Sequence, residues 1–110
     1  MSKEAVRIQE GEVVDYTASA TIANGAVIPL VGRVGIALND AVSGDVISLA
    51  LEGVYEITAK TADAIVFGAL VYWDDTEKEL TTTTTSNELA GFAVSAKAGA
   101  TAGSVYVKIG

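Results

Sequence analysis

Apolar and polar residues alternate along most of this chain with a period of two. Five segments show the alternation: EVVDYT (12–17), RVGIALN (33–39), VISLALE (46–52), VYEIT (54–58) and SVYVKI (104–109). Successive side chains of a β-strand point to opposite faces of a sheet, so this pattern predicts strands that are buried on one face.

Turn-forming residues recur between these segments. They are Asn24-Gly25, Asn39-Asp40, Ser43-Gly44-Asp45, Asp74-Asp75 and the glycine-containing stretch 99–103. Short strands separated by turns about every 8–12 residues are typical of β-sandwiches and small barrels. Gly53 lies between two strand-like runs, and we interpret it as a bend or bulge in one long strand. The sequence therefore predicts an all-β fold, a small barrel or β-clip-like domain of short antiparallel strands with little helix.

Only TAKTADAIVFGA (58–69) offers a helical alternative. Thr58 or Thr61 could cap a short turn that continues to Ile65. The segment is too short and too rich in β-branched residues to form a stable helix alone. We predict that residues 1–10 are an N-terminal arm and that residues 11–110 are a single β domain. SAKAGATAG (95–103) is predicted to be a mobile loop.

Composition narrows the possible functions. The 110 residues contain no Cys and no His, which excludes disulfides, thiolate metal sites and Ser–His–Asp or Cys–His catalysis. No phosphate-binding glycine motif occurs. The net charge of −7, without a lysine or arginine cluster, argues against nucleic-acid binding. No apolar run reaches the ~20 residues of a membrane span, and no hydrophobic signal core follows Met1, so we expect a cytosolic chain without a membrane partner. We predict no cofactor, no metal and no enzymatic activity.

The acidic stretch in VYWDDTEKELTTTTT (71–85) has three possible interpretations. Asp74, Asp75, Glu77 and Glu79 could bind a cation, perform acid–base chemistry or form the polar tip of a hairpin. A calcium loop needs a glycine turn and a distal bidentate glutamate, and this stretch lacks the glycine. An exposed turn also offers nothing to shift a carboxyl pKa. We therefore predict a hairpin tip between two strands.

Two neighbouring features leave alternatives open. The run Thr81–Thr85 suits a solvated edge strand, while a flat hydroxyl array for ice or sugar would require a repeat of such strands. Trp73, the one tryptophan, could pack in the core or anchor an interface. A carbohydrate-binding module of similar β type would need several exposed aromatic side chains, and the chain has few.

The order of these segments resembles the phage and prophage capsid cement, or head decoration, proteins. The resemblance runs from QEGEVVDYTA (9–18) through the region 23–57 to VYWD (71–74) before a threonine-rich stretch, and it reaches the end of the chain. Its most specific pieces are GVYEI (53–57) after GDVISLALE (44–52), and VYWD. The resemblance implies a non-enzymatic protein on the outer surface of an expanded phage head. Such a protein would bind the major capsid (coat) protein, stabilise contacts between coat subunits and commonly form a homotrimer. A tail protein or a carbohydrate-adhesion module is the alternative.

The N-terminal arm is the predicted capsid contact. Val6 and Ile8 alternate with Ala5, Arg7 and Gln9, a pattern that would let the arm add a strand to the edge of a coat-protein sheet. Equally, the same segment could be the first strand of the domain itself.

Overall fold

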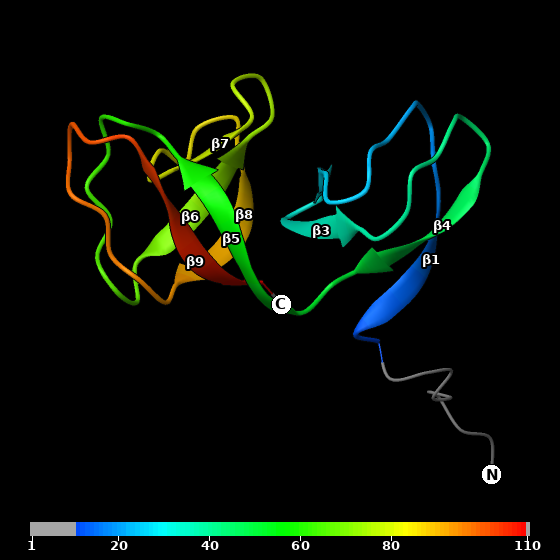
Figure 1. The fold of residues 1–110 in the computed structure, drawn as a ribbon, viewed down its shortest axis with the longest axis horizontal. Helices are drawn as coiled ribbons and strands as arrows, with labels where there is room; N and C mark the ends of the chain where they lie inside the picture. Colours follow the sequence, from blue (N-terminus) through cyan, green and yellow to red (C-terminus); the bar gives the residue numbers. More distant parts are fainter. Residues whose placement is uncertain (1–10, 110) are drawn as a thin grey trace, which may run out of the picture.

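A computed structural model describes residues 11–109, which form nine β-strands and contain no helix (Figure 1). The first four strands make an open antiparallel sheet with the spatial order β1-β4-β3-β2. Their bounds are β1 (Val13–Thr17), β2 (Val27–Leu30), β3 (Arg33–Ala37) and β4 (Val46–Ala50). The prediction of an all-β fold is confirmed.

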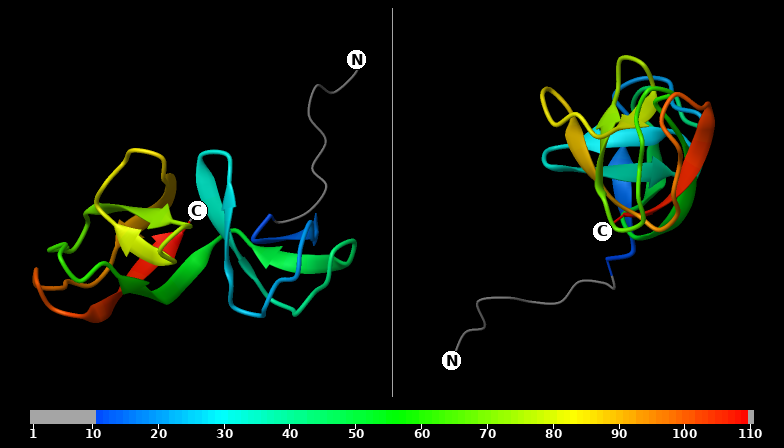
Figure 2. Two further views of the ribbon diagram at one scale, coloured as in Figure 1. Left: turned by 90° about the horizontal axis from the view of Figure 1, so that it is seen from above. Right: turned by 90° about the vertical axis from the view of Figure 1, so that its left-hand side faces the viewer.

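The other five strands pair in a closed circuit with the order β5-β7-β6-β8-β9, which we call the barrel. They are β5 (Gly53–Ala59), β6 (Leu70–Asp74), β7 (Glu79–Thr81), β8 (Glu88–Ala93) and β9 (Gly103–Ile109). All neighbours are antiparallel except β5 and β7, which close the circuit through the parallel pair Ala59 and Leu80. The open sheet and the barrel lie side by side along the longest axis (Figure 2).

The predicted alternation decides which side chains enter the core. In β9, Val105, Val107 and Ile109 are buried while Tyr106 and Lys108 are exposed. The main core also contains residues from both parts of the fold, because Val34 and Ile36 of β3 pack with the barrel residues. Ala37 belongs instead to a second, smaller cluster beneath the open sheet.

Two contacts explain how β3 fits between the open sheet and the barrel. Gly35 lies so close to β4 that an added Cβ would be 2.7 Å from Cγ of Leu49, so only glycine fits without displacing that side chain. In the turn between β2 and β3, the N–H of Gly32 donates a hydrogen bond to the carboxylate of Glu88 on β8. The contact at Gly35 lies within the open sheet, whereas the bond from Gly32 to Glu88 joins that sheet to the barrel.

Two local expectations are wrong, and the helical alternative for residues 58–69 is not adopted. Gly53 is not a bend within one strand: β4 ends at Ala50, and Gly53, with φ of 126°, begins β5 where the chain passes from the open sheet into the barrel. The segment 58–69 contains turns and an isolated bridge at Ile65 but no helix. The threonine run forms a strand only as far as Thr81.

Candidate functional site

The predicted contact residues Ala5, Val6, Arg7, Ile8 and Gln9 lie outside the described residues. The described chain begins at Gly11 and enters β1, an edge strand of the open sheet. The structure thus places the start of the described chain at the open sheet, and the role of residues 5–9 stays a prediction.

The acidic stretch is the tip of the β6–β7 hairpin, as predicted. Oδ1 of Asp74 accepts hydrogen bonds from the backbone N–H groups of Thr76 (3.0 Å) and Glu77 (3.1 Å). Lys78 adopts a left-handed conformation (φ 57°) and donates its N–H to the carbonyl oxygen of Asp74 (2.8 Å). Asp74 therefore serves to build the turn, as Asp and Asn commonly do.

Asp75 differs from the prediction in its pKa. Its carboxylate accepts hydrogen bonds from Nζ of Lys78 (2.7 Å) and from Nε1 of Trp73 (3.0 Å). The bond from Lys78, followed by the bond from Trp73, lowers the pKa of Asp75 below its ordinary value. The expectation that nothing shifts a carboxyl pKa here is wrong. Trp73 itself is buried in the main core, as the core hypothesis predicts, and only its N–H reaches this polar tip.

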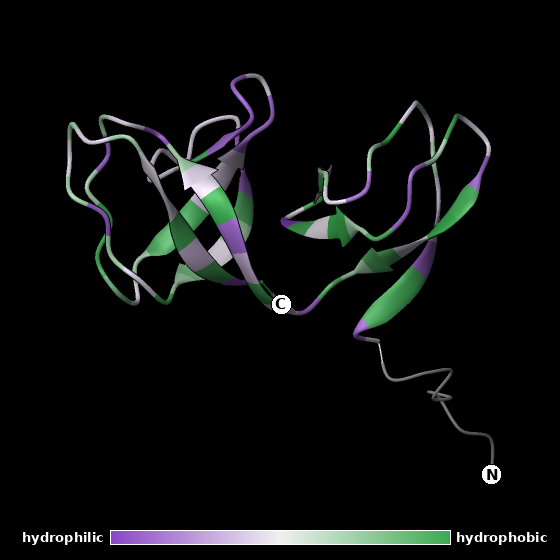
Figure 3. Cartoon of the chain, in the orientation of Figure 1, coloured by the Kyte–Doolittle hydropathy of each residue, from purple (hydrophilic) through white to green (hydrophobic). Residues whose placement is uncertain are grey.

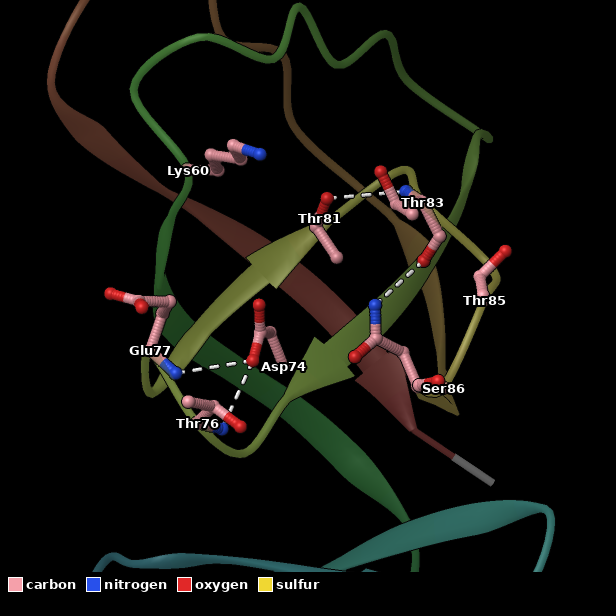
Figure 4. A pocket seen from close by; sticks show the side chains of 9 residues that line it. Lys60, Asp74, Thr76, Glu77, Thr81, Thr83, Thr85 and Ser86 are labelled. Atoms are coloured by element: carbon pink, nitrogen blue, oxygen red, sulfur yellow. Dashed lines mark hydrogen bonds between the residues drawn. The ribbon is translucent and has the colours of Figure 1, made fainter.

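The threonines curve around a polar hollow of about 290 Å³ instead of forming a flat array (Figure 4). Its lining comprises Lys60, Asp74, Thr76, Glu77, Thr81, Thr83, Thr85, Ser86 and Asn87. No aromatic side chain is among them, so the hollow lacks the stacking surface that carbohydrate binding commonly uses. Within residues 11–109 no three acidic side chains are grouped closely enough to hold a metal ion.

Asp63 explains why the threonine strand ends early. One of its carboxylate oxygens accepts hydrogen bonds from the hydroxyl of Thr81 (2.7 Å) and the backbone N–H of Thr82 (3.0 Å). The N–H of Thr83 then donates to the hydroxyl of Thr81 (3.1 Å). Side-chain acceptors thus replace the ladder partners of this backbone, and Thr81 is buried instead of solvated.

The pKa of Asp63 reflects opposing effects. Burial disfavours the charged form, but the hydrogen bonds from Thr82 and Thr81 and the nearby charge of Lys60 outweigh it, so the pKa lies below its ordinary value. The ionised carboxylate therefore helps to hold the 60–69 loop against the end of β7.

Lys97 joins the two loops at the far end of the barrel. Its side chain is only 8% exposed, and Nζ donates to the carbonyl oxygens of Asp63 (2.8 Å), Ala98 (2.9 Å) and Thr61 (3.1 Å). The backbones of Lys97 and Ile65 also exchange two hydrogen bonds (2.8 and 2.9 Å). The segment 95–103, predicted to be a mobile loop, is thus bound to the 60–69 loop by side chain and backbone.

Large apolar side chains are exposed beside these two loops. Val66 and Phe67 are 66% and 70% exposed, and Leu70 and Phe92, 57% and 38% exposed, lie opposite each other on β6 and β8. We call these four residues the barrel-end surface. The loops 61–69 and 94–102 next to it contain only two ionisable side chains, Asp63 and Lys97, and both are hydrogen-bonded within the protein.

The two ends of the barrel differ in the hydropathy of their residues (Figure 3). The β6–β7 hairpin is hydrophilic, whereas the loops farthest from the open sheet are mostly neutral or hydrophobic. Sequence patterning missed this arrangement, because neither Phe67 nor Lys97 belongs to a strand-like run. The feature of the sequence that could have indicated the buried Lys97 is a single lysine in a run of small residues, SAKAGATAG.

Comparison with known families identifies the class of protein. The phage cement protein family matches residues 8–109, nearly the whole chain. The chain therefore belongs to the phage cement protein family and has a structural role associated with the phage capsid. A search of the curated proteins and a search of the solved structures found no match. Residues 11–109 contain no helix long and apolar enough to cross a membrane.

Proposed function

We propose that this chain is a non-enzymatic cement protein that binds the outside of the expanded phage head and stabilises contacts between neighbouring coat subunits. The observation that carries the proposal is the family match over residues 8–109. The partner is the major capsid protein, and the chain resides in the host cytoplasm until it joins the virion.

The division of the fold into two parts supports a bridging role. The described chain begins at the open sheet, whereas the loops 60–69 and 95–103 lie at the opposite end of the molecule (Figure 1). Contacts at both ends would let one copy span two coat subunits. A homotrimer would multiply these contacts, because the second and third form at high effective concentration once the first has bound.

The arm supplies one of these contacts in our proposal. Residues 5–9 alternate as a strand does and would pair with an exposed edge of a coat-protein sheet. The nine described strands already complete an open sheet and a closed barrel among themselves, which supports a β-core that folds without residues 2–9. Removing the arm should therefore weaken capsid binding and leave that core folded.

Sedimentation with phage heads tests the proposal. Purified protein should pellet with expanded heads that lack their own cement protein and should stay in solution with unexpanded heads. Binding to neither form, or location on the tail in an intact virion, would overturn the proposed function. The mass of the native particle in solution tests the trimer.

Deletion of residues 2–9 tests the arm. The truncated chain should keep the circular dichroism spectrum of a β protein and pellet less with expanded heads. Unfolding of the truncated chain would show that the arm is a core strand. Undiminished pelleting would place the capsid contact elsewhere.

A further inference from the structure

We propose that the barrel-end surface, Val66, Phe67, Leu70 and Phe92, is a second capsid contact that inserts into an uncharged apolar recess of the coat-protein shell. This inference rests on the proposed function and specifies one of its contact surfaces. Exposed apolar side chains gathered in one place commonly mark a binding surface. Here Val66 and Phe67 follow each other on the 60–69 loop, Leu70 pairs with Phe92 across β6 and β8, and the N–H of Gly68 donates to the carbonyl oxygen of Ala93 next to them.

Charge favours this surface over the rest of the molecule. The chain carries a net charge of −7, and the β6–β7 hairpin alone contributes four carboxylates and one lysine. Two of the charged groups in the loops beside the barrel-end surface are hydrogen-bonded within the protein: the carboxylate of Asp63 by Thr81 and Thr82, and the ammonium group of Lys97 by three carbonyl oxygens. The third, Lys60, is exposed where the 60–69 loop begins. Lys108 pairs with Phe92 and is exposed on the same face, so one charged side chain lies beside the surface. An apolar partner that covers Val66 and Phe67 and leaves Lys60 and Lys108 in water would bury no unpaired charge, a burial that would be costly.

The loops are also held in place before any partner arrives. The bonds of Lys97 and the Ile65–Lys97 backbone pair fix the position of the segment that carries Val66 and Phe67. A surface that is already ordered loses less conformational entropy on binding. The buried lysine therefore has a role in recognition as well as in folding, because it fixes the two loops against each other.

Size favours the shell over a second copy of this chain. A stable interface between two free proteins takes about 20–30 residues on each side, and the barrel-end surface provides four large side chains. A small contact is sufficient when the same molecule is also held at its other end, since the contacts then act together.

Paired variants on heads that bind the unmodified chain provide the test. Val66→Ser with Phe67→Ser should weaken binding to expanded heads by about tenfold or more, as expected when central apolar anchors are lost. Val42→Ser with Val46→Ser is the matched control, because these valines are similarly exposed (59% and 65%) on the open-sheet side of the molecule. The control should bind within about twofold of the unmodified chain.

Charge substitutions separate apolar docking from electrostatic attraction. Phe67→Glu and Phe67→Lys should both weaken binding, because either charge would be buried in an apolar recess. Gain of affinity by one of them would overturn the proposal. Near-ultraviolet circular dichroism and the urea midpoint of each variant establish that the fold is retained.

The outcomes are distinguishable from those of the proposed function. If the unmodified chain binds no heads, both proposals fail. If the unmodified chain and the Val66/Phe67 double variant bind equally well, only the barrel-end proposal fails. A change in native mass of the double variant would assign the surface to contacts between copies, which also overturns the proposal.

Discussion

The ammonium nitrogen of Lys97 lies 2.8 Å from the backbone carbonyl oxygen of Asp63, while the carboxylate of the same Asp63 accepts hydrogen bonds from Thr81 and Thr82. Through this pair of residues, the 95–103 loop, the 60–69 loop and the end of β7 are linked. This link consists of polar groups, whereas the core of the protein is apolar. Its disruption should change the free energy of unfolding.

Replacing Lys97 by methionine should destabilise the protein by about 1–3 kcal/mol. Methionine retains most of the buried length but removes the Nζ donor from three carbonyl oxygens. The oxygen of Thr61 keeps a bond from the N–H of Thr101 (3.1 Å), whereas those of Asp63 and Ala98 lose this donor, and an unsatisfied acceptor costs about that much. Urea unfolding measures the change. Lys108→Met is the control, since Lys108 is exposed on β9, and it should change stability by less than about 0.5 kcal/mol. Equal effects of the two substitutions would contradict the structural role of Lys97.

Acid should destabilise the protein partly through Asp63. Its pKa is lowered in the folded state, so the ionised form favours folding. That contribution is complete above the unfolded pKa of about 3.9 and is lost as the pH falls through the lower folded value. The free energy of unfolding, measured between about pH 6 and pH 2, should therefore decrease in this window.

Asp63→Asn isolates the contribution of this carboxylate. The variant should be less stable at neutral pH by about 1–2 kcal/mol, because charge-assisted hydrogen bonds become neutral ones. Its stability should also fall less steeply below about pH 4 than that of the unmodified chain. Identical acid dependence in both chains would show that Asp63 does not titrate with folding.

Gly91→Ala should be among the most damaging single substitutions in the barrel. A Cβ at Gly91 would lie 2.0 Å from the backbone carbonyl oxygen of Lys108, and φ there is 157°. The β8–β9 pairing that completes the barrel must shift to admit the methyl group, at an expected cost of about 3 kcal/mol or more. Thermal unfolding provides the measurement.

Gly99→Ala is the matched control for this glycine. Its Cβ would make ordinary contacts, at 3.5 Å, with the carbonyl oxygen of Ala62 and Cβ of Ala64. The expected change in stability is within about 0.5 kcal/mol. A mild Gly91→Ala phenotype would mean that β8 and β9 are not held as closely as the structure shows.

Removing the charges of the acidic hairpin tip should change the stability of the protein little. Removing its hydrogen-bond acceptors should lower the stability more. Asp74→Asn with Asp75→Asn retains an oxygen acceptor at each position and should change stability by less than about 0.5 kcal/mol. Replacing both by alanine removes four hydrogen bonds and should cost about 1–2 kcal/mol. Because Trp73 is the one tryptophan, its fluorescence reports unfolding directly. Failure of the asparagine variant to fold would show that the charges are essential.

The alternation of apolar residues determined the strands, because a strand places every second side chain on the same face whatever its partners are. It predicted the buried rows of β5 and β9 and the turn between β6 and β7 correctly. The order of segments also carried enough information to indicate the family. These features are local in sequence or depend on sequence order alone.

The pairing of strands could not be obtained in this way. Nothing in the pattern of residues 46–59 says that β4 and β5 belong to different sheets, since Gly53 permits either a bulge or a change of direction. The burial of β3 on both faces likewise depends on the barrel packing against Val34 and Ile36.

The polar links depended most on tertiary structure. Thr81 is an ordinary strand residue by propensity, and only the approach of Asp63, 18 positions earlier, buries its hydroxyl and ends the strand. Lys97 would be expected at the surface as a single lysine, but the 60–69 loop brings two carbonyl oxygens to it, those of Thr61 and Asp63. Sequence alone determined which residues form strands and how they alternate; tertiary structure decided which loops meet, because hydrogen bonds between distant segments depend on the path of the whole chain.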